Sequence, residues 1–257
     1  MLLAVGQRLH SRSATLLVSL EQRLPTIMRY WLAIAIGASV LRIVTSPLQG
    51  HVPGLATILP YVLLIAAPLV SMLLGLRWFA EGDSQPQPAT RLAFVGRWRS
   101  VSRVEAQRLP LYGTTGFMVS LMIGMLINVP IRAAEYLTAV PAIGTAVPEW
   151  LRVFHAMMTL DVVMLSSLYT IAFVAALRRV PLFPRLLMAT WAIDLASQIT
   201  IAEAVANTPG LPTNVAGSLL QFLDGNVQKV LISVALWLPY LLMSRRVNLT
   251  YRLRIPA

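Results

Sequence analysis

Residues 151–177 read LRVFHAMMTLDVVMLSSLYTIAFVAAL and contain only two charged side chains, Arg152 near the start and Asp161 near the middle. An apolar run of this length exceeds the roughly 20 residues that a helix needs to cross the hydrocarbon core of a bilayer. The stretch therefore predicts a transmembrane helix that carries one acidic residue at mid-membrane depth.

Similar stretches recur along the chain. Of the 257 residues, 57% are apolar and 12% charged, against about 45–50% and 25% in ordinary soluble domains. The mean hydropathy is +0.70. Besides 151–177, spans are predicted at about 30–47, 55–79, 111–129, 186–205 and 227–243. The sequence thus predicts an all-α, polytopic transmembrane helical bundle of about six spans that forms a single domain over 29–257.

The first 28 residues have a different character. Leucines alternate with charged residues, a pattern typical of an amphipathic helix in the headgroup plane, and Pro25 is expected to end that helix. The charges interrupt the apolar core that a signal peptide requires. Residues 1–28 are therefore interpreted as an N-terminal segment on the cytoplasmic side.

Basic residues are distributed unevenly between the loops. Arginines are concentrated in the loop 81–110, in the turn 178–185 and in the tail after 244. The alternate loops, 46–54 and 207–214, contain neither Lys nor Arg, and the third is expected to contain only Arg132. Because basic loops remain in the cytoplasm, this asymmetry predicts that both termini are cytoplasmic and that the protein lies in a bacterial inner membrane.

The formal net charge is +11, which raises the question of which anionic molecule the basic residues bind. Since the arginines flank apolar spans, anionic lipid headgroups are a nearer partner than nucleic acid, which is not expected to bind. The absence of cysteine excludes disulfides and thiolate metal sites. No phosphate-binding loop, metalloprotease helix or nucleophile elbow is present, so no catalytic residue, cofactor or metal is predicted.

Four polar residues inside the predicted spans form the candidate site: Asp161, Asp194, Gln198 and Glu203. Charges are costly in lipid and usually face the interior of a bundle. A proton relay, a cation site and simple interhelical hydrogen bonding all fit this set. Neither aspartate has the flanking residues expected of an intramembrane aspartyl protease.

Two other polar residues lie near the predicted outer ends of spans. Arg42 is expected to extend toward the headgroups, with pairing to Glu203 as the alternative. His155 is more typical of a hydrogen-bonded interface residue than of a metal ligand, because no second histidine follows at helical spacing.

Small residues recur in the predicted third span at intervals of three and four, which allows another helix to approach closely. They are Gly113, Gly116, Ser120 and Gly124. The last span is less regular, since 215–223 before it is also apolar and four polar residues, Asp224, Asn226, Gln228 and Lys229, interrupt the run. We expect this part either to project outward as one helix or to turn at Gly225 as an interfacial segment.

The C-terminal stretch 237–247, WLPYLLMSRRV, with Thr250-Tyr251 after it, resembles the closing signature of the YdgK-like bacterial membrane proteins, a family whose activity is not established. Trp31-Leu32, Gly37 and Ser46-Pro47 resemble its opening helix, and Phe183-Pro184 its entry to the penultimate helix. Family members have about four spans, so this chain departs by two inserted spans and the basic loop. The resemblance implies an inner-membrane helical protein and supplies no activity.

The same tail contains residues suited to membrane anchoring. Trp237 and Tyr240 are expected at headgroup level, and Arg245 and Arg246 in the cytoplasmic leaflet. The leading interpretation is a non-enzymatic accessory or assembly subunit whose partner is another membrane protein or a second copy of itself. The alternative is a small proton- or cation-coupled transporter or channel that uses Asp161 and Asp194. A third is a membrane enzyme acting at the basic face.

Overall fold

Helices dominate the structure. The computed structural model describes residues 2–46, 54–90, 96–144 and 147–257, with side chains from residue 13 onward except that of Asn214. The elements in this part of the chain are α1 (Leu2–Thr45), α2 (Leu55–Trp78), the 3-10 turn η1 (Gly82–Ser84), β1 (Trp98–Ser100), α3 (Arg103–Arg108), α4 (Phe117–Ala139), α5 (Glu149–Leu177), α6 (Phe183–Ala206), α7 (Thr213–Met243), α8 (Arg245–Arg252) and β2 (Arg254–Pro256). The predicted all-α class is confirmed.

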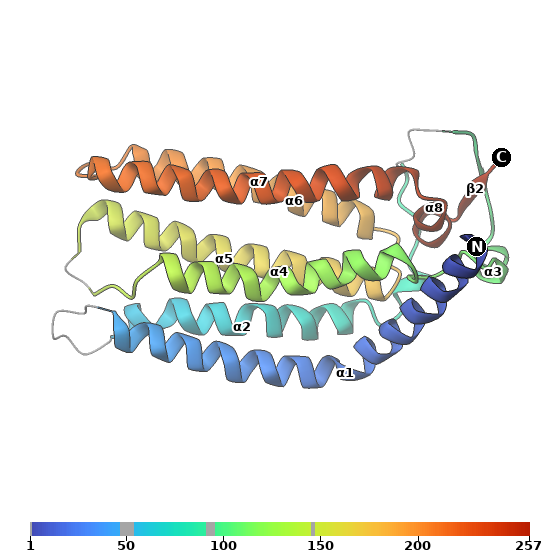
Figure 1. The fold of residues 1–257 in the computed structure, drawn as a ribbon, viewed down its shortest axis with the longest axis horizontal. Coiled ribbons are helices and arrows are strands. Elements are labelled where there is room, and N and C mark those ends of the chain that lie inside the picture. The colour runs from blue at the N-terminus through green and yellow to red at the C-terminus, as the bar shows by residue number, and fades with distance from the viewer. Residues whose placement is uncertain (1, 47–53, 91–95, 145–146) are drawn as a thin grey trace.

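The long helices lie side by side as one bundle (Figure 1). Helix α5 is at its centre and packs against α2, α4 and α6, while α7 packs against α6 and α1 against α2 and α4. The α2–α5 contact is close, because a Cβ atom at Gly75 would lie 3.2 Å from Cβ of Val174. Both termini, α3 and α8 lie at the same end, which we call the basic end (Figure 1). There β1 pairs antiparallel with β2.

In the described part of the chain, five helices are long and apolar enough to cross a membrane: α1, α2, α4, α5 and α7. A multi-pass membrane protein is therefore plausible on length and composition. The predicted fifth span is present as the 24-residue helix α6, but α6 is not among these five. The reason is visible in its sequence, since Arg185, Asp194 and Glu203 lower its mean hydropathy.

Three predicted boundaries are wrong. Helix α1 does not end at Pro25 but continues through it, because a proline costs one backbone hydrogen bond and bends a helix without necessarily ending it. Figure 1 shows this helix bending along its length. Helix α7 begins at Thr213, 14 residues before the predicted span 227–243, and runs unbroken for 31 residues, or about 46 Å at 1.5 Å per residue, so the single-helix alternative is right and the turn at Gly225 is wrong. Helix α4 begins six residues later and ends ten residues later than the predicted span 111–129.

Several sequence-based expectations fall partly on residues outside the described part of the chain. These are the end of the first span at Pro47, most of the loop 46–54, Arg91 in the basic loop, and the side chains of the N-terminal segment before residue 13. Within the described part of the basic loop, α3 is the only α-helix.

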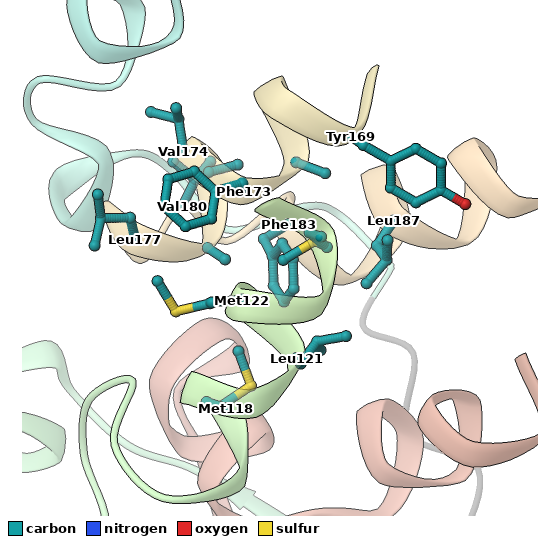
Figure 2. Packing of buried hydrophobic residues seen from close by; sticks show 14 of the residues in the cluster. Met118, Leu121, Met122, Tyr169, Phe173, Val174, Leu177, Val180, Phe183 and Leu187 are labelled. Carbon is teal, nitrogen blue, oxygen red and sulfur yellow. The ribbon is translucent and has the colours of Figure 1, made fainter. Parts of the chain in front are cut away.

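The largest apolar core lies toward the basic end. Methionines 118 and 122 of α4 pack with Phe173 of α5 and with Phe183 and Leu187 of α6 (Figure 2). Tyr169 lies at the edge of this core and its hydroxyl points away from the methionines (Figure 2). On the side of Tyr169 away from the basic end, the bundle interior is polar, and the candidate site lies there.

Candidate functional site in the bundle interior

Three charged side chains meet inside the bundle, each from a different helix. Arg132 comes from α4, Asp161 from α5 and Asp194 from α6. The guanidinium Nη1 of Arg132 lies 3.0 Å from Oδ2 of Asp161, and Nη2 lies 2.6 Å from Oδ2 of Asp194. The side chains of Arg132, Asp161 and Asp194 are 11%, 3% and 0% exposed. One buried arginine thus joins two buried aspartates.

Neutral side chains donate further hydrogen bonds to both carboxylates. The Tyr169 hydroxyl donates to Oδ2 of Asp194 at 2.9 Å. Ser197 and Gln198 both donate to Oδ1 of Asp161, the latter at 3.1 Å. We call these six residues the Arg132 cluster: Arg132, Asp161, Tyr169, Asp194, Ser197 and Gln198. Because hydrogen bonds to ionised groups are worth about 1.5–3 kcal/mol each, the cluster joins α4, α5 and α6 firmly.

A polar chain leads from the cluster to the surface. Nδ2 of Asn226 on α7 donates to Oε1 of Gln198 at 3.2 Å, and Nζ of Lys229 donates to Oδ1 of Asn226 at 3.3 Å. Lys229 also forms an ion pair with Glu135 of α4. The Lys229 side chain is 58% exposed, so this pair lies on the outside of the bundle. A cavity of about 50 Å³ between α4 and α7 is lined by Arg132 together with Glu135, Asn226 and Lys229.

Two atoms of the cluster lack a partner. Oδ1 of Asp194 and Nε of Arg132 are buried and accept or donate no hydrogen bond among the described residues. A buried carboxylate oxygen without a donor is expensive in a low-dielectric interior. The charges do not balance either, since one guanidinium faces two carboxylates. Binding one proton or one monovalent cation would neutralise the cluster.

The structure brings together three of the four predicted site residues. Asp161, Asp194 and Gln198 belong to one network, whereas Glu203 is exposed and forms no hydrogen bond or ion pair with the described residues of that network. The alternative pairing of Arg42 with Glu203 is wrong, because Arg42 donates to the backbone oxygens of Val140 and Thr138.

Sequence reasoning missed Arg132, the residue that joins the cluster. The predicted third span ends near residue 129, which places Arg132 in an outer loop, but α4 continues to Ala139, nine residues past Pro130. A signal was available, since 131–139 has no Gly, Pro, Asn or Asp that would favour a turn. Asn226 and Lys229 were treated as interruptions of the last span, yet they face α4 and α6.

The histidine and glycine expectations have separate outcomes. His155 is buried against the edge of Tyr136, with ring centroids 6.4 Å apart. Within the described part of the chain, no three His, Asp or Glu side chains are grouped closely enough to hold a metal ion. Gly113 and Gly116 precede α4, and a Cβ atom at Gly124 would meet nothing within 4 Å, so the small residues make no close helix contact in this chain.

The four predicted anchoring residues lie near the basic end of α7. The Trp237 and Tyr240 rings contact each other edge to face, with centroids 6.0 Å apart. Arg245 is exposed. Arg246 instead packs against the protein, where its Nη1 donates to Oγ1 of Thr115 at 2.6 Å.

Comparison with known proteins gives no match: no family model, no curated protein and no solved structure is similar to this chain.

Proposed function

We propose that the chain is a proton- or cation-coupled transport protein of a bacterial inner membrane, with the Arg132 cluster as its coupling site. The observation that carries the proposal is the sharing of one buried guanidinium between two buried aspartates on neighbouring helices. Ionisable residues inside a membrane bundle are rare and typically mark ion or proton pathways. The uneven arginine distribution supports six passes, α6 included, with both termini in the cytoplasm.

Coupling follows from the charge of the cluster. When both aspartates are ionised, Arg132 holds α5 and α6 to α4 through two ion pairs. A proton or cation at Oδ1 of Asp194 would neutralise that carboxylate and weaken its attraction for the guanidinium. Arg132 would then pair with Asp161 alone, and α6 would be free to shift relative to α4. A charge change at one oxygen would thereby bias a helix contact between two states.

The polar chain provides a route for the ion. The cavity between α4 and α7 connects Arg132 with the exposed Lys229–Glu135 pair. A charged pair on the outer surface of a membrane bundle is stable where water reaches it. We therefore propose that ions enter between α4 and α7.

The test is ion flux in sealed liposomes that contain the purified protein, with internal dyes for H⁺, Na⁺ and K⁺ and an imposed gradient of each. For the ion that the wild type conducts, Asp161→Asn and Asp194→Asn are expected to reduce the rate at least about tenfold, because each removes a titratable or cation-binding carboxylate. Glu203→Gln is the matched control, since Glu203 is an acid of the same helix as Asp194 that lies outside the cluster.

Gel filtration and thermal unfolding in detergent establish that each variant is folded before its flux is compared. Wild-type flux in a folded Asp194→Asn protein would contradict the proposal, as would an equal loss in Glu203→Gln.

An accessory or assembly subunit is the second candidate, favoured by the exposed face of α4. Ser120 and Gly124 lie one turn apart on that face, with Ile127 and Ile131 continuing it, and none of them is covered by another helix of this chain. Small residues next to large apolar ones suit a partner helix. The C-terminal resemblance to the YdgK-like family is compatible with a transport protein and with an accessory subunit.

Affinity purification from membranes in a mild detergent tests this second candidate. A stoichiometric membrane-protein partner is expected, and Gly124→Leu should release it because the bulky side chain fills the open face of α4. Gly37→Leu on α1, where a Cβ atom also meets nothing within 4 Å, is the control. A monodisperse protein without partner would count against the accessory role.

A further inference from the structure

A second polar site lies at the basic end of the bundle, far from the Arg132 cluster along the helices. It is a pocket of about 520 Å³ between α1, α3, the loop before α4 and the C-terminal end of α5. Three guanidinium groups line it, those of Arg103, Arg178 and Arg179. We call it the basic-end pocket.

Two of these guanidinium groups are incompletely satisfied. Arg103 donates through Nη2 to the backbone oxygen of Gln85 at 3.2 Å, and Arg178 pairs through Nη1 with Glu21 at 3.2 Å. The Nε atoms of both arginines are buried and have no hydrogen-bond partner among the described residues. The Nε atoms are too enclosed to reach an anion themselves, but Arg103 forms no ion pair among the described residues, so its charge is available to an anion in the pocket.

Three acidic residues, Glu21, Glu81 and Asp83, also line the pocket, and among the described residues only Glu21 forms an ion pair with one of its arginines. The Glu21 carboxylate is engaged by Arg178, and Asp83 accepts hydrogen bonds from Tyr112 and Gln107. Burial, followed by the bond to Asp83, raises the pKa of the Tyr112 hydroxyl to about 12, so Tyr112 remains a donor at neutral pH. The third acid, Glu81, is exposed to solvent.

The backbone at Arg179 points to a role for this side chain beyond ending a helix. The N–H of Arg179 bonds to the Ala176 oxygen at 3.1 Å and the N–H of Val180 to the Ala175 oxygen at 2.9 Å, which is the Schellman arrangement. The position after such a helix end is usually glycine, because φ is positive there. Arginine occupies it with φ of 56°, and its guanidinium lies 5.7 Å from the centroid of the Tyr112 ring.

We propose that the basic-end pocket binds a phosphate group through Arg103, Arg178 and Arg179. Phosphate spreads its charge over several oxygens, which the planar forks of several arginines match better than a single carboxylate does. The group is either the headgroup phosphate of a membrane lipid or part of a soluble phosphate compound. This site is independent of the Arg132 cluster and of its proposed function.

Thermal shift of the full chain in a phosphate-free maltoside detergent tests the proposal. Inorganic phosphate and short-chain phosphatidylglycerol are titrated separately at constant ionic strength, with chloride as the reference anion. At least one of the two is expected to raise Tm saturably. Arg103→Gln and Arg178→Gln should weaken binding about tenfold, since each removes a charge-assisted hydrogen bond worth about 1.4 kcal/mol or more.

Arg108→Gln is the matched control, because Arg108 is exposed on the same short helix as Arg103 and does not line the pocket. Arg179→Gly keeps the proposal testable if the other variants fail to fold. Glycine suits the positive φ, so this variant should unfold at the wild-type Tm or higher without ligand, and still lose affinity.

Saturation by inorganic phosphate would identify a soluble phosphate compound as the ligand, and saturation by the lipid alone would identify a headgroup. No saturable shift with either probe would overturn the proposal. Equal weakening by Arg103→Gln and Arg108→Gln would also overturn it, since the effect would then be general surface electrostatics.

Discussion

Replacing Arg132 by glutamine is expected to lower the free energy of unfolding by about 3–5 kcal/mol, the cost of removing one partner from a buried ion pair. The two aspartates that Arg132 now joins would be left close together, ionised and almost completely buried. Their repulsion and desolvation are then no longer offset by the guanidinium, so keeping both carboxylates charged costs stability. Denaturant or thermal unfolding in a defined detergent micelle measures the loss.

The triple variant Arg132→Gln, Asp161→Asn, Asp194→Asn separates charge from shape. Asn keeps the shape of each aspartate, Gln leaves a polar amide in place of the guanidinium, and the variant removes every charge of the cluster. Since neutral replacement of a whole buried ionic group is often close to neutral for stability, it should recover most of the lost stability. Failure of the triple variant to recover any stability would show that the charges do not cause the loss.

The buried aspartates were predictable from sequence, and their partner was not. Asp161 and Asp194 each interrupt a long apolar run, so their burial follows from the length of the run and the cost of charge in lipid. Arg132 follows Pro130 by two residues, and its assignment depends on whether the helix continues past the proline. The ion pairs of Arg132 with Asp161 on α5 and Asp194 on α6 stabilise that continuation. A single sequence does not show which side chains from different helices pair.

The same reasoning accounts for the other errors. Pro25 and the polar residues before 227 are local signals against a continuous helix, and tertiary packing overrides such signals when neighbouring helices hold the chain on either side. The helix α6 shows the opposite case. Its Asp194 and Gln198 lower its apolar character, yet α5 and α7 supply the polar partners that keep it in the bundle.

Replacing Tyr251 by alanine is expected to cost about 3–5 kcal/mol, the usual range for deleting a large buried ring. Tyr251 is completely buried in α8, its ring centroid lies 4.9 Å from that of Phe183, and its hydroxyl donates to the Ala176 oxygen at 2.9 Å. It therefore holds α8 in contact with the end of α5 and the start of α6. Two segments that carry the resemblance described above, Phe183-Pro184 and Thr250-Tyr251, meet at this contact.

Tyr251→Phe separates the ring from the hydroxyl. It keeps the contact with Phe183 and removes one hydrogen bond, so a loss of about 1 kcal/mol is expected. Tyr30→Ala is the control: this ring is 66% exposed on α1, and about 0.5 kcal/mol or less is expected there. Equal losses for Tyr30→Ala and Tyr251→Ala would contradict the fastening role.

Alkaline pH gives an independent readout of the same contact. Burial raises the pKa of Tyr251 well above its ordinary value of 10.0. Because the folded state holds this proton more tightly than the unfolded state, the stabilisation is complete below pH 10.0 and is lost as pH rises from there toward the folded pKa. The wild type should therefore lose stability above pH 10.0 more steeply than Tyr251→Phe, which has no hydroxyl at this position to ionise. Parallel pH profiles for the two proteins would show that the phenol is hydrated and that α8 is not held against α5 in the way the contact requires.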